Sequence, residues 1–430
     1  MTIQKKIHIN TKLIYFYFLV VLLFFVIGFV LNEDSSGGGQ LDFIHEYKSF
    51  LEFKSGIFTA LTSLSYESSR TPLFLILNSF NIFADDEYSF RLSNFIFNFF
   101  IIFSFYFCLK FQKIYDHNLS LLIVCVLLFS PYFRSSSYWA HQENLPFLFY
   151  FLALIFYNLW KSNIDQNLFI KIFIIAFLSS LSFYSDQKFI FVSFSTFLFF
   201  LIKFNFEINK SCKVFFIYFL TSLPAFYLFY IWGGILPKES QFRIGFYREN
   251  ISSSLSIIAF YFLPIILIYL KDILKNKVSL KFNKIDLLIF FLLLIVNLFT
   301  IPNFDSSWGQ GVIYKLFYIL KLKLGIYNFL IIFVYLAFLQ SISFTIYMLL
   351  KNNLLNFLPI IIITLISSFV ERTYNEYFDP LILVLIFTFF KFNENFKINQ
   401  KQLIILYSFF YFSFLVFANL YYKYFNLNAI

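Results

Sequence analysis

The stretch "LIYFYFLVVLLFFVIGFVL", residues 13–31, decides the fold class. It runs for 19 residues without one charged side chain, and about 20 apolar residues carry a helix across the hydrocarbon core of a bilayer. Lys5 and Lys6 precede it, but the run is long for the apolar part of a signal peptide and no small-residue cleavage site follows. We therefore expect a retained first membrane span.

Comparable apolar runs recur along all 430 residues. Mean hydropathy is +0.77 and only 13% of residues are charged, against about 25% in soluble domains. The short alternating segments of a membrane β-barrel do not occur in the sequence. The sequence predicts an all-α, polytopic integral membrane protein of about 11–13 transmembrane helices, forming a single membrane domain over residues 1–430. Thirteen candidate spans lie near 13–31, 92–111, 119–133, 145–160, 168–184, 189–203, 214–231, 256–270, 286–302, 326–350, 354–370, 378–391 and 402–422.

Lysine and arginine are distributed unevenly between the two sides of these spans. The N-terminus and the even-numbered loops hold 19 basic and 6 acidic residues, whereas the other side holds 14 basic and 17 acidic residues. The net charges of +13 and −3 together give the +10 of the whole chain. The positive-inside rule places the N-terminus in the cytoplasm and, after thirteen spans, the C-terminus outside the inner (plasma) membrane. Membrane topology accounts for the excess of basic over acidic residues, so the net positive charge does not imply a nucleic-acid partner.

The first extracytoplasmic loop, residues 32–91, is by far the longest and carries nine acidic residues. Apolar residues recur at helical spacing in "LDFIHEYKSFLEFK", residues 41–54. This pattern predicts an amphipathic helix on the membrane surface. Its expected apolar stripe consists of Phe43, Tyr47, Phe50, Leu51 and Phe53, and its expected polar face of Asp42, His45, Glu46, Ser49 and Glu52. A second surface helix is indicated at 71–83, where Pro72 suits the first helical position.

The order of features in residues 33–95 resembles the first periplasmic loop of the GT-C glycosyltransferases. In that superfamily an Asp follows the first span and opens a surface helix, which matches Asp42 in "GGGQLDFIHEY". A second surface helix opens with a proline motif, which matches "SRTPLFLIL" with Arg70 and Pro72. An acidic stretch and an Arg-Leu at the next span match "DDEYSFRLSNF", with Glu87 and Arg91.

Weaker similarities follow later in the chain. "WAHQENLPFLFYFLALIFY" resembles a span that opens with an acidic residue, here Glu143. "WGGILPKESQFR", which ends at Arg243, resembles an outer loop of the glucosyltransferase branch, and "ERTYNEYFDPLILVL", with Arg372 and Tyr374, resembles a late motif before a proline-bearing span.

The resemblance implies transfer of a sugar from a polyprenyl-phosphate donor to a lipid or glycan acceptor on the outer face. A carboxylate must then take the acceptor proton, and cations must stabilise the departing phosphate. We expect Asp42 to be the base and Arg372 to lead the phosphate-binding candidates. The further candidates for donor or acceptor binding are His45, Glu46, Arg70, Glu87, Arg91, Glu143, Lys188, Arg243, Arg248 and Tyr374. No cofactor is fixed by the resemblance, although a divalent metal is compatible with it; the other expected partners are membrane lipids.

Two other classes of protein remain open. A transporter or flippase should place charges within spans and break helices in paired halves, and the sequence shows neither pattern. A polysaccharide polymerase would also use lipid-linked glycans, but its chief sign would be a large outer loop late in the chain. The three cysteines and four histidines are scattered, so neither a disulfide framework nor a His-rich metal site is predicted.

The charge distribution gives a topological prediction. A reporter fused after Lys284 should read cytoplasmic, and one inserted near Ser68 should read external, because basic loops stay inside. Alkaline phosphatase and fluorescent-protein fusions measure both positions. The opposite pair of readings would place the first loop in the cytoplasm and remove it from any outer-face chemistry.

Overall fold

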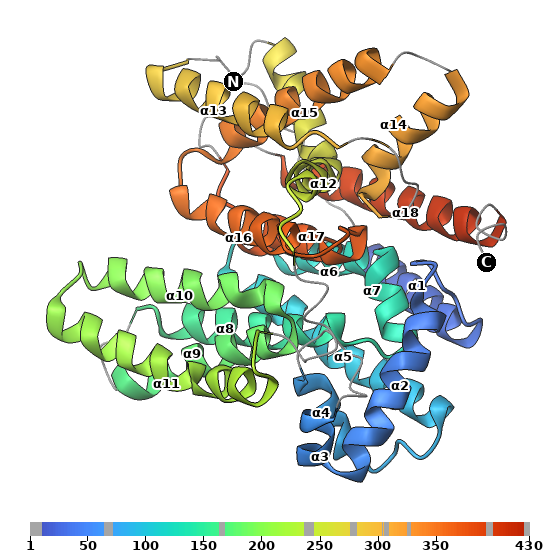
Figure 1. Cartoon of the computed structure of the whole chain (residues 1–430), viewed down its shortest axis with the longest axis vertical. Helices are drawn as coiled ribbons and strands as arrows, with labels where there is room; N and C mark the ends of the chain where they lie inside the picture. Colours follow the sequence, from blue (N-terminus) through green and yellow to red (C-terminus); the bar gives the residue numbers. More distant parts are fainter. Residues whose placement is uncertain are drawn as a thin grey trace.

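Helices make up 82% of the residues that the structure describes (Figure 1). The computed structural model describes residues 11–63, 72–162, 168–235, 245–275, 282–302, 304, 309–324, 328–392 and 399–424. No β-strand occurs within these ranges. The predicted all-α polytopic membrane fold is thereby confirmed.

The helices follow one another in this order along the chain. The first nine are α1 (Thr11–Val30), α2 (Gly39–Ser55), α3 (Ile57–Thr62), α4 (Leu73–Ser79), α5 (Glu87–Gln112), α6 (His117–Leu128), α7 (Pro131–Tyr138), α8 (Leu145–Trp160) and α9 (Leu168–Ser185). The others are α10 (Ile190–Lys203), α11 (Ile208–Trp232), α12 (Glu249–Leu274), α13 (Lys284–Phe299), α14 (Gly311–Leu324), α15 (Asn328–Leu350), α16 (Phe357–Ser368), α17 (Leu381–Thr388) and α18 (Gln400–Tyr424). Short 3₁₀ turns are η1 (Gln142–Asn144), η2 (Gln187–Phe189), η4 (Leu354–Asn356) and η5 (Asn375–Tyr377).

Seven of the described helices are long and apolar enough to cross a membrane, and an eighth span results if one bent pair counts as a single crossing. The seven are α1, α5, α9, α11, α12, the greater part of α15, and α18. Other expected spans coincide with shorter helices, such as α8 with 16 residues and α10 with 14. At 1.5 Å per residue a 16-residue helix is about 24 Å long, which is short of the hydrocarbon thickness.

The bent pair consists of α6 and α7, whose axes differ by 69°. Ser130 and Pro131 cause the break. Pro131 lacks an N–H and occupies the first turn of α7, where no hydrogen bond is lost, and the Ser130 hydroxyl accepts a hydrogen bond from the N–H of Phe133 at 3.1 Å. All eight residues of α7 are buried, so this polar helix (PYFRSSSY) lies inside the protein.

Three clusters of apolar side chains hold the helices together. The largest runs through α1, α5–α8, α12 and α16–α18 and includes one face of α2. A second lies between α9, α10 and α11, and a third between α14 and α15. Figure 1 shows the corresponding groups: α8–α11 on one side, α12–α15 on the other, and α1 and α2 beside α5–α7.

The described part of the first loop forms α2, α3 and α4, and both α3 and α4 pack on α2. Phe43, Phe50 and Phe53 of α2 are buried as predicted. Glu46 is buried with them, so its expected place on the polar face is wrong: it lies three residues from Phe43 and four from Phe50, on the same side of the helix. Leu51, by contrast, is 47% exposed. The second expected helix, 71–83, is the shorter α4.

Candidate functional site

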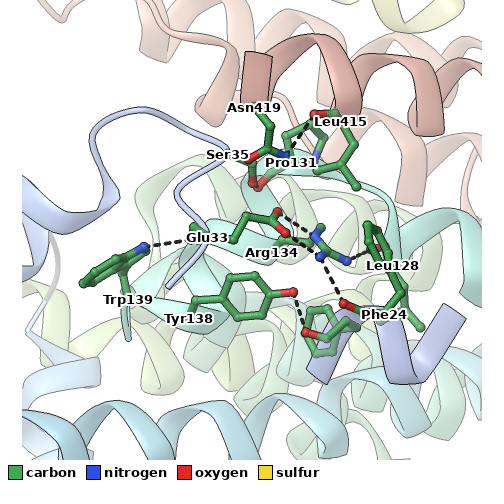
Figure 2. Close-up of polar contacts among 11 residues, drawn as sticks. Phe24, Glu33, Ser35, Leu128, Pro131, Arg134, Tyr138, Trp139, Leu415 and Asn419 are labelled. Carbon is green, nitrogen blue, oxygen red and sulfur yellow. Dashed lines mark hydrogen bonds and ion pairs between the residues drawn. The ribbon is translucent and has the colours of Figure 1, made fainter. Parts of the chain in front are cut away.

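A buried ion pair joins the start of the first loop to α7 (Figure 2). Arg134 donates from Nε to Glu33 Oε1 at 2.8 Å and from Nη2 to Glu33 Oε2 at 2.6 Å. The Arg134 side chain is 0% exposed and that of Glu33 13%. Two parallel charge-assisted hydrogen bonds of this kind fix both the distance and the orientation of the partners.

The remaining donors of Arg134 reach backbone oxygens. Nη1 donates to Leu128 O at 3.2 Å and Nη2 to Phe24 O at 3.3 Å, while the Phe24 ring lies 4.6 Å from the guanidinium carbon. A Cβ at Gly28 would lie 2.5 Å from Arg134 Nη2 and from Tyr138 Oη. Only glycine therefore lets α1 approach α7 this closely.

The loop continues along α7 through two more contacts drawn in Figure 2. The indole Nε1 of Trp139 donates to Glu33 O at 3.0 Å, and the Ser35 hydroxyl donates to Pro131 O at 2.6 Å. Residues 33–35 are thus held to α7 at both its ends. This attachment fixes where α2 begins.

Asp34 organises the first turn of α2. Its carboxylate accepts five hydrogen bonds, from the backbone N–H groups of Gly37 (3.0 Å), Gly39 (3.1 Å) and Gln40 (3.2 Å) and from the hydroxyls of Ser36 (3.0 Å) and Ser135 (3.2 Å). The N-cap residue of α2 is a glycine with no side chain to cap the helix. Asp34 supplies the missing acceptor from four residues upstream and stabilises the free N–H groups.

Asp42 follows in the first turn of α2 and is half-buried. Gly38 lies beside it, with an added Cβ there 3.8 Å from Asp42 Oδ2. Within the described ranges the Asp42 carboxylate has no hydrogen-bond or ion-pair partner, in contrast to Glu33 and Asp34. It is therefore available to hydrogen-bond a ligand.

Arg91 and His141 enclose this turn from the side of α5 and η1. Arg91 donates to Tyr138 O and to Asn32 Oδ1, both at 2.9 Å, and its guanidinium stacks 3.9 Å from the centroid of the Trp139 ring. His141, 6% exposed, places Nε2 at 3.0 Å from Gly39 O. A carbonyl only accepts, so Nε2 carries the proton. His141 thus holds the backbone of the loop, and Arg91 holds the side chain of Asn32.

A segment far along the chain closes the site from the other side. Asp379, which lies between α16 and α17, accepts from the Ser130 hydroxyl at 2.7 Å and faces the N–H of Tyr132 at 3.4 Å. It therefore sits at the N-terminus of α7, where the helix dipole favours negative charge. Tyr422 of α18 contacts Tyr132 and lies within the electrostatic reach of Asp34 and Glu376.

The other predicted site residues are scattered around this centre. Lys188 pairs with Asp186 at 3.0 Å and lies 5.0 Å from the Tyr377 ring centroid. Arg372, with 41% of its side chain exposed, is 3.9 Å from Glu371 and contacts Tyr374. His45 and Glu87 are exposed, Glu143 is half-buried in η1, and Arg248 is exposed just before α12. Arg70 and Arg243 lie outside the described residues.

The structure places the Arg91 guanidinium 5.8 Å from the ring centroid of Phe43, the residue next to Asp42. Within the described ranges it shows no hydrogen bond or ion pair between Asp42 and either Arg91 or Arg372. It adds Glu33, Asp34, Arg134 and Ser135, which the sequence reasoning did not select. Two features of the sequence could have indicated them. Two adjacent acids directly follow the first span, and an arginine stands in the polar run "SPYFRSSSYWAHQEN". Among the described residues, no three His, Cys, Asp or Glu side chains gather to hold a metal ion.

The fold defines the chain as a polytopic helical membrane protein. No family model matches it, and neither a curated protein nor a solved structure matches it.

The buried ion pair gives a stability prediction. Arg134→Met or Glu33→Gln leaves one charge buried without its partner, which typically costs about 3–5 kcal/mol. Either variant should lower the unfolding temperature in detergent by several degrees, and the double variant should lose less than the two single losses combined. Asp85→Asn, which breaks only a 3.7 Å contact of an 85% exposed side chain with Lys54, should hardly change it. Equal melting of all variants would show that the pair does not hold the loop.

Proposed function

We propose that this protein is a membrane glycosyltransferase that uses a polyprenyl-phosphate-linked sugar. The acceptor is a lipid or glycan on the extracytoplasmic face of the plasma membrane. Asp42 is the catalytic residue of the proposal. The observation that carries it is the contrast between Asp42 and its neighbours. Asp42 is a half-buried carboxylate without a partner among the described residues, and it stands on a turn that Glu33 and Asp34 hold in place.

The position of the turn supports this chemistry. The start of α2 is braced by Asp34, by Arg91 through Asn32, and by His141 through Gly39. A base that works by geometry must be held within a few tenths of an ångström of its productive position. Long apolar helices beside the site, α1 and α5 among them, offer the surroundings that a polyprenyl chain needs.

The proposed step is a single displacement. A hydroxyl oxygen of the acceptor forms a bond to the anomeric carbon of the donor sugar, and the bond from that carbon to the phosphate oxygen breaks. The hydroxyl proton passes to Asp42, and polyprenyl phosphate leaves with the bonding electron pair. A cation near the departing phosphate stabilises its growing charge.

Arg372 remains the preferred phosphate partner among the residues that the sequence selected. Lys188 is held by Asp186, and Arg91 is committed to a carbonyl and an amide oxygen. Arg372 also has neighbours, Glu371 at 3.9 Å and Tyr374, but 41% of its side chain is exposed, against 13% for Lys188. Its planar guanidinium suits two phosphate oxygens at once.

One observation favours a transporter or flippase as the second candidate. The bent pair α6–α7 and the fully buried Arg134 are features that membrane transporters share. Protein in sealed vesicles distinguishes the two functions: a flippase moves a fluorescent lipid-linked sugar between leaflets without changing it, whereas a transferase converts it to polyprenyl phosphate and a glycosylated product.

The test is transfer by Asp42→Asn. The substitution keeps size and most hydrogen bonding but removes the charge, and loss of a general base costs about 10²–10⁴-fold in rate. Purified protein in vesicles, supplied with a panel of polyprenyl-phosphate-linked hexoses and pentoses and a membrane lipid extract as acceptor, reports the rate as release of polyprenyl phosphate.

Asp85→Asn is the matched control. It makes the same chemical change on an 85% exposed residue of the same loop and should transfer at the rate of the unaltered protein. Transfer by Asp42→Asn at the unaltered rate would overturn the catalytic assignment. Release of polyprenyl phosphate from none of the donors by the unaltered protein would overturn the function itself.

A further inference from the structure

Helix α14 carries a cation that the sequence did not single out. The apolar runs leave residues 303–325 between two expected spans, yet Gly311–Leu324 is helical and packs on α12 and α15. Lys315, Lys321 and Lys323 interrupt its apolar residues, which is why no span was predicted there. Figure 1 shows α14 next to the C-terminal part of α18.

The three lysines of α14 differ in their surroundings. Lys321 donates to Phe304 O at 3.1 Å, and Lys323 is exposed. Lys315 is half-buried, with its ammonium 5.6 Å from the centroid of the Tyr421 ring. No carboxylate pairs with Lys315 among the described residues, and burial without a counter-ion lowers the pKa of its ammonium. An anion placed there would recover the lost stabilisation.

Neighbouring residues link Lys315 to two segments of the proposed active site. The segment that enters α14 is held to the late loop, since the N–H of Gln310 donates to Thr373 O at 2.5 Å and an added Cβ at Gly309 would lie 3.4 Å from Arg372 Cβ. Lys315 follows Gly311 by four residues, about 6 Å along the helix axis. Tyr421, whose ring lies beside the Lys315 ammonium, precedes Tyr422, and the Tyr422 ring packs on Gly37 of the first loop.

We propose that Lys315 binds the phosphate group of the polyprenyl-phosphate donor. The assignment rests on the proposed function and adds a residue to it. Lys315 supplies a compact point charge and up to three N–H donors to the phosphate oxygens, and Arg372 reaches the same group from the late loop. Because Lys315 is half-buried beside the Tyr421 ring, its charge is screened less than that of an exposed lysine, which strengthens its attraction for an anion.

The experiment measures binding rather than turnover. Purified protein in lipid nanodiscs is titrated with undecaprenyl phosphate, with undecaprenol, which lacks the charge, and with inorganic phosphate. Lys315→Met keeps length and apolar contacts and should bind undecaprenyl phosphate about tenfold to a hundredfold more weakly, the effect of one charge-assisted hydrogen bond. Lys315→Arg should bind within about threefold of the unaltered protein, and undecaprenol should not distinguish the variants.

Lys323→Met is the matched control, because it removes the same charge from an exposed position on the same helix. Its affinity should equal that of the unaltered protein. The unfolding temperature of each variant distinguishes a loss of binding from a loss of folding. If Lys315→Met does not fold, binding by Lys315→Arg still tests whether a positive charge at this position is required.

Three results would overturn the assignment. Lys315→Met could bind undecaprenyl phosphate normally, Lys323→Met could weaken binding as much, or only inorganic phosphate binding could change, which would make the site one for free phosphate. The proposed function is judged separately. It fails if the unaltered protein binds undecaprenyl phosphate no better than undecaprenol, and it stands without Lys315 if Asp42→Asn binds normally but transfers nothing.

Discussion

The buried pair of Glu33 and Arg134 is the constraint on which the rest of the structure depends. A guanidinium with no exposed surface costs several kcal/mol unless a carboxylate meets it, and the acid that meets it comes from the first residues after α1. Because the pair is bidentate, it sets the direction of the chain as well as its position. The start of α2, and with it Asp42, follows from that direction.

The acids of the site divide into two groups by what they accept. Asp34 and Asp379 stand at the beginnings of α2 and α7 and receive N–H and hydroxyl groups that the helices leave unsatisfied. Their charges are used within the protein. Asp42 shares the same neighbourhood but accepts no such bond within the described ranges, so its charge is not used in this way. The hydrogen bonds of Asp34 therefore hold the turn that carries Asp42 and leave the Asp42 carboxylate to meet a ligand.

Hydropathy and helical spacing were sufficient for the fold class, because membrane spans depend on length and apolar content alone. They failed where the pattern was mixed. Aromatic residues occur so often in α2 that more than one face looks apolar, and Glu46 was assigned to the wrong one. Helix α14 was missed because three lysines interrupt it.

The site was predictable only in part, for a different reason. Asp42 could be selected because it opens a surface helix in a long acidic loop. Arg134 could not, since an arginine at the end of a span ordinarily extends its side chain to the interface. Its partner lies 101 residues away in the sequence, and only the packing of α1 against α7 brings the two together.

The contact of Gly37 with Tyr422 has a consequence for biogenesis. Gly37 adopts φ +76°, and any side chain there would overlap the Tyr422 ring, so the first loop and the last described helix fit against each other directly. During synthesis the first loop emerges while nearly all the other helices are still to be made. The contact between Gly37 and Tyr422 can form only after α18 has been inserted, because Tyr422 belongs to that helix. Contacts so distant in sequence form late, so a nascent chain halted before α18 holds every acid of the first loop without the completed site.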